Sequence, residues 1–236
     1  MLFHWCLTTI LLLSSINLAH AADDSAVATA KQNLLNVLEG YKTGAPISDA
    51  LKAAVDAAAE DLENTQSSGV NLNSNPDVKG IWVTLFSSQG ILGTVDVSFM
   101  TRALPGGGKS GGTASIKSVS QELRPDSRFY RNMMVMTAGK DETPILYVAT
   151  ADLGIAADKS DDLEVLFHTI AFVPGGMDVS MPDVRAALAL SEDTPLSIDI
   201  PLSLQRKASR STVTYLDDNL RINRGKNYVA VMQKVQ

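Results

Sequence analysis

Cysteine, histidine and tryptophan are scarce in this sequence of 236 residues, which holds one Cys, three His and two Trp. A disulfide within the chain and a cysteine-based zinc site are therefore excluded. Basic excess is also lacking: the formal net charge is −6, which argues against a nucleic-acid-binding protein. With 45% hydrophobic and 19% charged residues, the composition is that of a folded globular protein.

Long hydrophobic runs are missing except at the N-terminus, where residues 7–18 are mostly apolar. This run is short for a membrane-spanning helix, and it ends in Ala19-His20-Ala21, a small-x-small pattern typical of signal peptides. We therefore expect residues 1–21 to be a signal peptide that is cleaved between Ala21 and Ala22. The protein would then be exported to the periplasm or the cell exterior, without its only Cys. An uncleaved membrane anchor is the alternative.

After cleavage a single histidine, His168, would remain. It lies in the β-rich run 163–173, where alternation places it on one face with Leu166, Ile170 and Phe172. A Ser-His-Asp hydrolase would need this residue as its base, and no G-x-S-x-G segment accompanies it. We expect His168 to be a core or rim residue, and we predict no catalytic residues, no metal site and no cofactor.

Two other segments resemble binding motifs only in part. Residues 103–110 read Ala-Leu-Pro-Gly-Gly-Gly-Lys-Ser, but a β-rich run follows instead of the helix that a phosphate loop requires. We interpret this segment as a hairpin loop. Asp158, Asp161 and Asp162 lack the Gly and Glu positions of a calcium loop, so we interpret them as a solvated acidic turn.

Helical periodicity follows the N-terminal run. Apolar residues recur in steps of three and four from Val27 to Tyr41 and again from Ile47 to Leu62, with Gly44-Ala45-Pro46 between the two stripes. These stripes predict a helical pair over residues 22–64, arranged as an antiparallel hairpin or a short cap. Residues 65–79 are polar and are expected to form a linker.

From Gly80 onward the hydrophobic period changes to two, which predicts β-strands. Eight or nine strands after a helical pair predict a mainly β (α+β) fold with an antiparallel barrel or sandwich over residues 80–236. A short helix is expected at Pro182–Ala189. The expected strands are Ile81–Phe86, Thr94–Phe99, Ala114–Leu123, Arg128–Thr137, Ile145–Ala151, Leu163–Val173, Ser197–Ile200, Ser211–Leu216 and Tyr228–Val235.

Charge is distributed unevenly along the chain. Residues 1–64 carry a net charge of −5, and residues 202–236 carry +5. One interpretation is that the acidic helices pack near the basic C-terminal segment. The other is that Arg206, Lys207 and Arg210 face the anionic headgroups of a membrane surface.

The segment Thr214–Gly225, which reads TYLDDNLRINRG, closely resembles the signature of the plastid lipid-associated protein (PAP/fibrillin) family. Gly80-Ile81-Trp82 followed by Leu85-Phe86-Ser87-Ser88 resembles the first strand of that family. The pre-sequence is not rich in Ser and Arg as plastid transit peptides are, so we expect an exported bacterial member. The residues shared with the family motifs are Gly80, Trp82, Tyr215, Leu216, Asp217, Leu220, Arg221, Ile222, Arg224 and Gly225.

The resemblance implies one domain over residues 22–236 with a lipocalin-like barrel that binds a lipid or another hydrophobic small molecule without catalysis. Candidate lining residues are Val95, Val97, Phe99 and the Met133–Met136 cluster, although a filled core would have the same composition. The alternative is a structural or partner-binding module at a membrane surface, with a filled barrel. An enzyme is the third hypothesis, for which the sequence offers no catalytic group.

The motif residues also suggest structural roles. The Trp82 indole is expected to close one end of the barrel, with Arg221 or Arg224 stacked on the ring. Asp217 is placed to pair with Arg221 or to accept hydrogen bonds from nearby backbone N–H groups, and Gly225 would permit a left-handed turn. We expect that replacing Trp82 or Arg221 by Ala mainly lowers stability.

Overall fold

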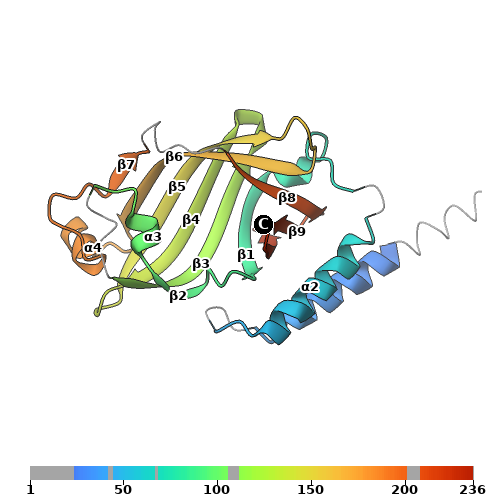
Figure 1. The fold of residues 1–236 in the computed structure, drawn as a ribbon, viewed down its shortest axis with the longest axis horizontal. Helices are drawn as coiled ribbons and strands as arrows, with labels where there is room; N and C mark the ends of the chain where they lie inside the picture. The colour runs from blue at the N-terminus through green and yellow to red at the C-terminus, as the bar shows by residue number, and fades with distance from the viewer. Residues whose placement is uncertain (1–23, 42–44, 67–68, 106–111, 201–207, 236) are drawn as a thin grey trace, which may run out of the picture.

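The computed structural model describes residues 24–41, 45–66, 69–105, 112–200 and 208–235. Two helices come first, over residues 24–39 and at α2 (Asp49–Glu63). They lie side by side and run antiparallel along one side of the molecule (Figure 1). The Ser48 side chain starts α2 by accepting a hydrogen bond from the Leu51 backbone N–H at 3.1 Å. No helix among the described residues is long and apolar enough to cross a membrane.

Strands make up most of the remaining chain. Short helical elements interrupt them: η1 (Pro76–Val78), α3 (Ser98–Thr101), η3 (Pro125–Ser127) and α4 (Met181–Ala187). The strands are β1 (Gly80–Ser87), β2 (Gly93–Asp96), β3 (Thr113–Arg124), β4 (Phe129–Ala138), β5 (Thr143–Ile155), β6 (Asp162–Pro174), β7 (Ser197–Asp199), β8 (Ser209–Leu216), β9 (Leu220–Gly225) and β10 (Tyr228–Lys234).

The sheet closes into an antiparallel barrel. Its strand order is β1-β10-β9-β8-β6-β5-β4-β3, and β1 also pairs with β3. Trp82 shows the closure directly, because it pairs with Lys234 of β10 on one side and Gln121 of β3 on the other. Strands β2 and β7 lie outside this ring of eight and pair with β3 and β6. The predicted fold class, a helical pair followed by an antiparallel lipocalin-like barrel, is confirmed.

Two details of the strand prediction were wrong. The alternating segment Thr94–Phe99 does not continue as one strand, because β2 ends at Asp96 and α3 begins at Ser98. The Asp96 carboxylate accepts a hydrogen bond from the Ser98 backbone N–H between them. The expected strands also omitted β9 (Leu220–Gly225), which pairs with both β8 and β10.

A β-bulge changes which side chains of β6 point into the barrel. The pairing of β5 with β6 shifts between Thr150 and Ala151, so no residue of β5 lies directly opposite His168. Leu163 and Val165 are buried before the bulge, whereas Ile170 and Phe172 are buried after it. The expectation that His168 shares one face with Leu166, Ile170 and Phe172 was therefore wrong, because an extra residue reverses the alternation.

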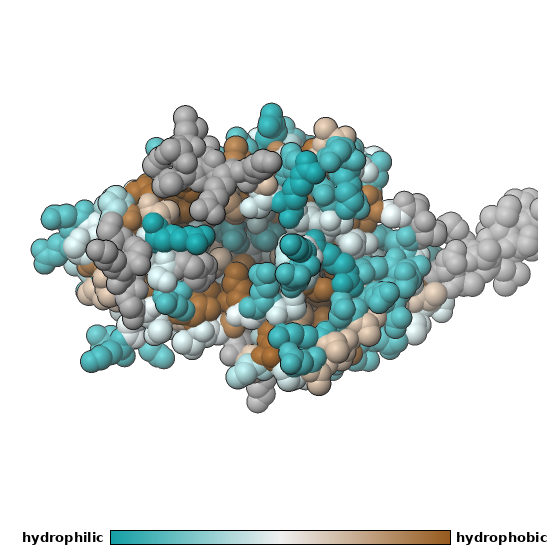
Figure 2. Space-filling model, viewed as in Figure 1, coloured by the Kyte–Doolittle hydropathy of each residue, from teal (hydrophilic) through white to brown (hydrophobic). Residues whose placement is uncertain are grey.

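Apolar side chains pack in three clusters. One fills the barrel near α3 and α4, and Ile116, Met136 and Phe172 are among its most buried members. A second surrounds Trp82, and it includes Val70, Leu72 and Val78 from the polar segment 65–79. The third joins the two helices to the outer face of β1, β8, β9 and β10. In Figure 2, hydrophobic surface is visible in the centre of the viewed face, with hydrophilic residues around it.

Candidate functional site

Strand β9 divides the family motif between two environments. Leu220 and Ile222 point outward and pack with the helices, and Arg224 bonds to residues of α2. Arg221 and Asn223 point to the opposite side, because successive side chains of a strand alternate between its faces. Arg221 contacts Trp82 and Gln121 there, and Asn223 lines a cavity inside the barrel.

Trp82 and Arg221 form a buried stacked pair. Both side chains are fully buried, and the guanidinium carbon lies 4.9 Å from the centre of the indole. The indole N–H donates to the Val78 carbonyl oxygen at 3.1 Å, and the Lys234 ammonium lies 5.2 Å from the ring. Of the two arginines considered for this position, the structure selects Arg221, a contact worth on the order of 2 kcal/mol when desolvated.

The charge of Arg221 has no counter-ion among the described residues. Its Nη2 donates to Gln121 Oε1 at 2.5 Å and contacts Met232 Sδ at 2.7 Å. Within the described part of the chain, its Nε and Nη1 atoms have no hydrogen-bond partner. Burial lowers the pKa of Arg221 to about 10, so the group remains cationic at neutral pH. A buried cation without a carboxylate is costly for folding.

Arg224, on the outward face, has two carboxylate partners by comparison. Its Nε donates to both carboxylate oxygens of Glu63, at 2.8 and 2.9 Å. Its Nη1 donates to Asp56 Oδ1 at 2.6 Å. The bonds to Glu63, partly opposed by burial, raise the pKa of Arg224. The acidic α2 thus packs against the basic C-terminal segment, as one interpretation of the charge distribution expected.

Asp217 holds the turn between β8 and β9. Its carboxylate accepts hydrogen bonds from the backbone N–H groups of Asn219 and Leu220, from the Tyr215 hydroxyl and from Lys31 of the first helix at 2.6 Å. Burial alone would raise the pKa of Asp217, but these bonds lower it below its ordinary value. Of the two expected roles, the backbone bonds are present, and the cationic partner is Lys31 instead of Arg221.

Two glycines in the motifs allow close approach of other side chains. At Gly225 an added Cβ would lie 2.0 Å from the Tyr228 ring. Because Gly225 is not among the described residues with positive φ, the expected left-handed turn was wrong. Gly80 has φ +138°, and a Cβ there would lie 2.7 Å from Lys234 Cε.

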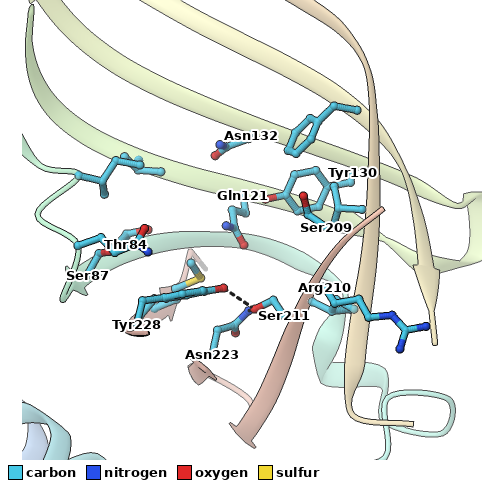
Figure 3. A pocket seen from close by; sticks show the side chains of 18 residues that line it. Thr84, Ser87, Gln121, Tyr130, Asn132, Ser209, Arg210, Ser211, Asn223 and Tyr228 are labelled. Atoms are coloured by element: carbon cyan, nitrogen blue, oxygen red, sulfur yellow. Dashed lines mark hydrogen bonds between the residues drawn. The ribbon is translucent and has the colours of Figure 1, made fainter. Parts of the chain in front are cut away.

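A cavity of about 200 Å³ lies inside the barrel between the inward faces of β1, β3, β4, β6, β8, β9 and β10 (Figure 3). Its apolar wall includes Val119, Leu163, Val165, Phe167, Ala230 and Met232. Its polar wall includes Thr84, Ser87, Gln121, Asn132, Ser211 and Asn223. Hydrophobic surface combined with a few polar groups is typical of small-molecule sites, although this volume is smaller than most.

Hydrogen bonding within the cavity wall is incomplete. The Tyr228 hydroxyl bonds to Ser211 Oγ at 2.8 Å, and Asn223 Nδ2 donates to Ser211 Oγ at 2.9 Å. The amide oxygens of Asn132 and Asn223 are buried and have no partner among the described residues. Buried polar groups in native proteins are usually satisfied, so these atoms are available to a molecule in the cavity.

The expected lining residues lie elsewhere in the barrel. Val95, Val97, Met134 and Met136 belong to the filled cluster near α3 and α4, and none of them lines the cavity described above. Met133 is half-buried and Val135 is exposed, because alternate residues of β4 face outward. The side chain of Phe99 lies outside the described residues. For β4, sequence periodicity identified the inward face but could not distinguish side chains that pack in the filled cluster from those that line the cavity.

Other candidate residues do not join this site. His168 Nε2 lies 3.9 Å from Asp152 Oδ1, and its Nδ1 lies 3.5 Å from Thr150 Oγ1. The side chain is 41% exposed. Arg210 borders the cavity, but it pairs with Asp158 and Glu164 and points away from the interior (Figure 3).

The two remaining acidic residues, Asp161 and Asp162, pair with Lys159. No group of three or more His, Cys, Asp or Glu that could hold a metal ion occurs among the described residues. Ala21, Ala22, Arg206, Lys207 and most of the segment 103–110 lie outside the described residues.

The fold and the cavity define a lipocalin-like barrel with a partly hollow interior. The PAP_fibrillin family model matches residues 28–233, so the chain belongs to the PAP/fibrillin family. Among curated proteins no sequence matches it.

One solved structure is similar, a lipocalin-like protein from Bacteroides uniformis ATCC 8492 with 10% sequence identity and a TM-score of 0.29. The likeness covers 67% of this chain and 99% of that one. Because this TM-score is low, the barrel assignment rests on the strand pairing of this chain.

Proposed function

We propose that this protein binds a lipid-like hydrophobic molecule inside its barrel and does not catalyse a reaction. The observation that carries the proposal is the cavity of about 200 Å³ within a closed ring of strands. Membership in the PAP/fibrillin family supports it. The position of His168 outside the cavity lining supports a role without catalysis.

The proposal includes export of the protein before it acts. Residues 1–21 carry the apolar run and the Ala19-His20-Ala21 pattern of a signal peptide. Intact-mass measurement of protein recovered from a bacterial periplasm tests this part. The mass of a chain that starts at Ala22 is expected, and a chain that retains Met1 in the membrane fraction would contradict export.

Native mass spectrometry tests the binding proposal. The full chain is exposed to a mixed lipid extract, and any bound molecule is identified after solvent extraction. We expect one lipid-like molecule per chain. A mass without ligand after this exposure would contradict the proposal and favour the alternative, a filled barrel that acts through a partner at a membrane surface.

A matched pair of variants locates the bound molecule. Ala230 lines the cavity and is buried, whereas Ala57 lies exposed on α2. Ala230→Phe places a ring in the cavity and should abolish uptake, while Ala57→Phe should keep it. Both variants are first checked for a cooperative thermal transition. Equal uptake by the two folded variants would place the ligand outside this cavity.

A further inference from the structure

A buried positive charge, that of Arg221, lies directly behind the cavity wall. Among the described residues Arg221 is a fully buried cation without a carboxylate partner. Its Nη2 contacts Gln121 and Met232, and both of these side chains line the cavity. The positive charge therefore lies one side chain away from the hollow, in surroundings where water screens it little.

Gln121 connects this charge to the cavity. Its amide oxygen accepts the hydrogen bond from Arg221, so its amide nitrogen is the end that can donate to a ligand. Asn132 and Asn223 also line the hollow, but their unpartnered atoms in the described part of the chain are amide oxygens. These oxygens accept hydrogen bonds and cannot bond a carboxylate, so Gln121 is the amide that a carboxylate would contact. Figure 3 shows Gln121, Asn132 and Asn223 around the same hollow.

We propose that the ligand is a single-chain amphiphile with a carboxylate head, which lies against Gln121 and balances the charge of Arg221. This inference rests on the proposed function and names its ligand class. One cation is balanced by one anionic charge, which fits a carboxylate better than a phosphate monoester with nearly two. The apolar wall of Leu163, Val165 and Phe167 accommodates the chain, and the small volume favours one acyl chain over two.

The experiment compares dodecanoate with dodecanol, which differ only in the head group. The full chain carries Trp5→Phe, so that Trp82 is its only tryptophan and its fluorescence reports on the environment of Arg221. We expect dodecanoate to bind about tenfold more tightly than dodecanol, or better, as a charge-assisted hydrogen bond allows.

Three variants assign the preference to Arg221. Arg221→Met removes the buried charge and should make the two affinities equal. Arg221→Lys keeps the charge and should keep most of the preference for dodecanoate. Arg102→Met removes one charge at an exposed position after α3 and should leave the preference unchanged. If Arg221→Met does not fold, the wild-type ratio and Arg221→Lys still decide the question.

The outcomes separate the two proposals. Equal affinity of the wild type for acid and alcohol would overturn the carboxylate assignment and leave lipid binding standing. Loss of the acid preference in Arg102→Met would show that surface charge causes it, which also overturns the assignment. Binding of neither compound would contradict both proposals.

Discussion

The polar side chains on the two faces of β9 differ in how completely they are paired. On the outward face, Arg224 has two carboxylate partners, and the apolar side chains of Leu220 and Ile222 are covered by the helices. On the inward face, Arg221 and Asn223 keep atoms that have no partner among the described residues. The outward face thus ties the barrel to the helices, whereas the inward face carries those polar atoms, on which the proposed ligand binding rests.

Ile222→Ala should have the largest effect on stability. The side chain is fully buried between the barrel and the helices, and its truncation should lower the free energy of unfolding by about 2–5 kcal/mol. Urea titration measures this loss. Because Ile222 points away from the cavity, the affinity for a bound lipid should remain unchanged, and a weakened affinity in the folded variant would contradict the division of β9 into two faces.

Arg224→Met should have the next largest effect. It leaves Glu63, whose side chain is 14% exposed, without its cation, and we expect a loss of about 1–2 kcal/mol in the free energy of unfolding. Lys52→Met removes an exposed pair with Asp49 on the same helix and serves as the control, with no measurable change expected. Equal losses in the two variants would show that overall charge matters instead of this contact.

Asp217→Asn should weaken the dependence of the free energy of unfolding on pH in the acidic range. The pKa of Asp217 is lowered in the folded protein, so its contribution is present above the unfolded pKa of about 3.9 and is lost as the pH falls through the folded value. Thermal melting should separate the variant from the wild type at neutral pH, and the difference in melting temperature should narrow as the pH falls below the unfolded pKa. A difference that stays constant with pH would contradict this role.

Asn223→Ala should have the smallest effect on stability, although it adjoins Ile222. The change removes one hydrogen bond to Ser211 and also one buried oxygen without a described partner, so the net change should be below about 1 kcal/mol. Affinity for dodecanol, whose hydroxyl can donate to the Asn223 amide oxygen, should nevertheless fall in the same fluorescence titration. A large loss of stability with unchanged affinity would reverse the assignment of the inward face.

Local sequence patterns predicted much of this architecture. The stripes from Val27 to Tyr41 and from Ile47 to Leu62 predicted the two helices, and the change to a period of two at Gly80 predicted the strands. The motif Thr214–Gly225 identified the family that the profile match then showed. These signals are local, because helix and strand periods follow from backbone geometry alone.

Tertiary structure decided where each inward side chain lies along the barrel. Met134 and Asn132 both belong to β4, yet the first packs in the filled cluster and the second lines the cavity. The bulge at His168 reversed the faces of β6 through its pairing with β5, which no pattern within β6 reveals. The stacking of Arg221 on Trp82 likewise depends on barrel closure. The ion pair between Lys31 and Asp217 depends on the packing of the first helix against the barrel. Sequence thus determined most of the elements, whereas long-range pairing determined that Arg221 is buried without a carboxylate partner among the described residues.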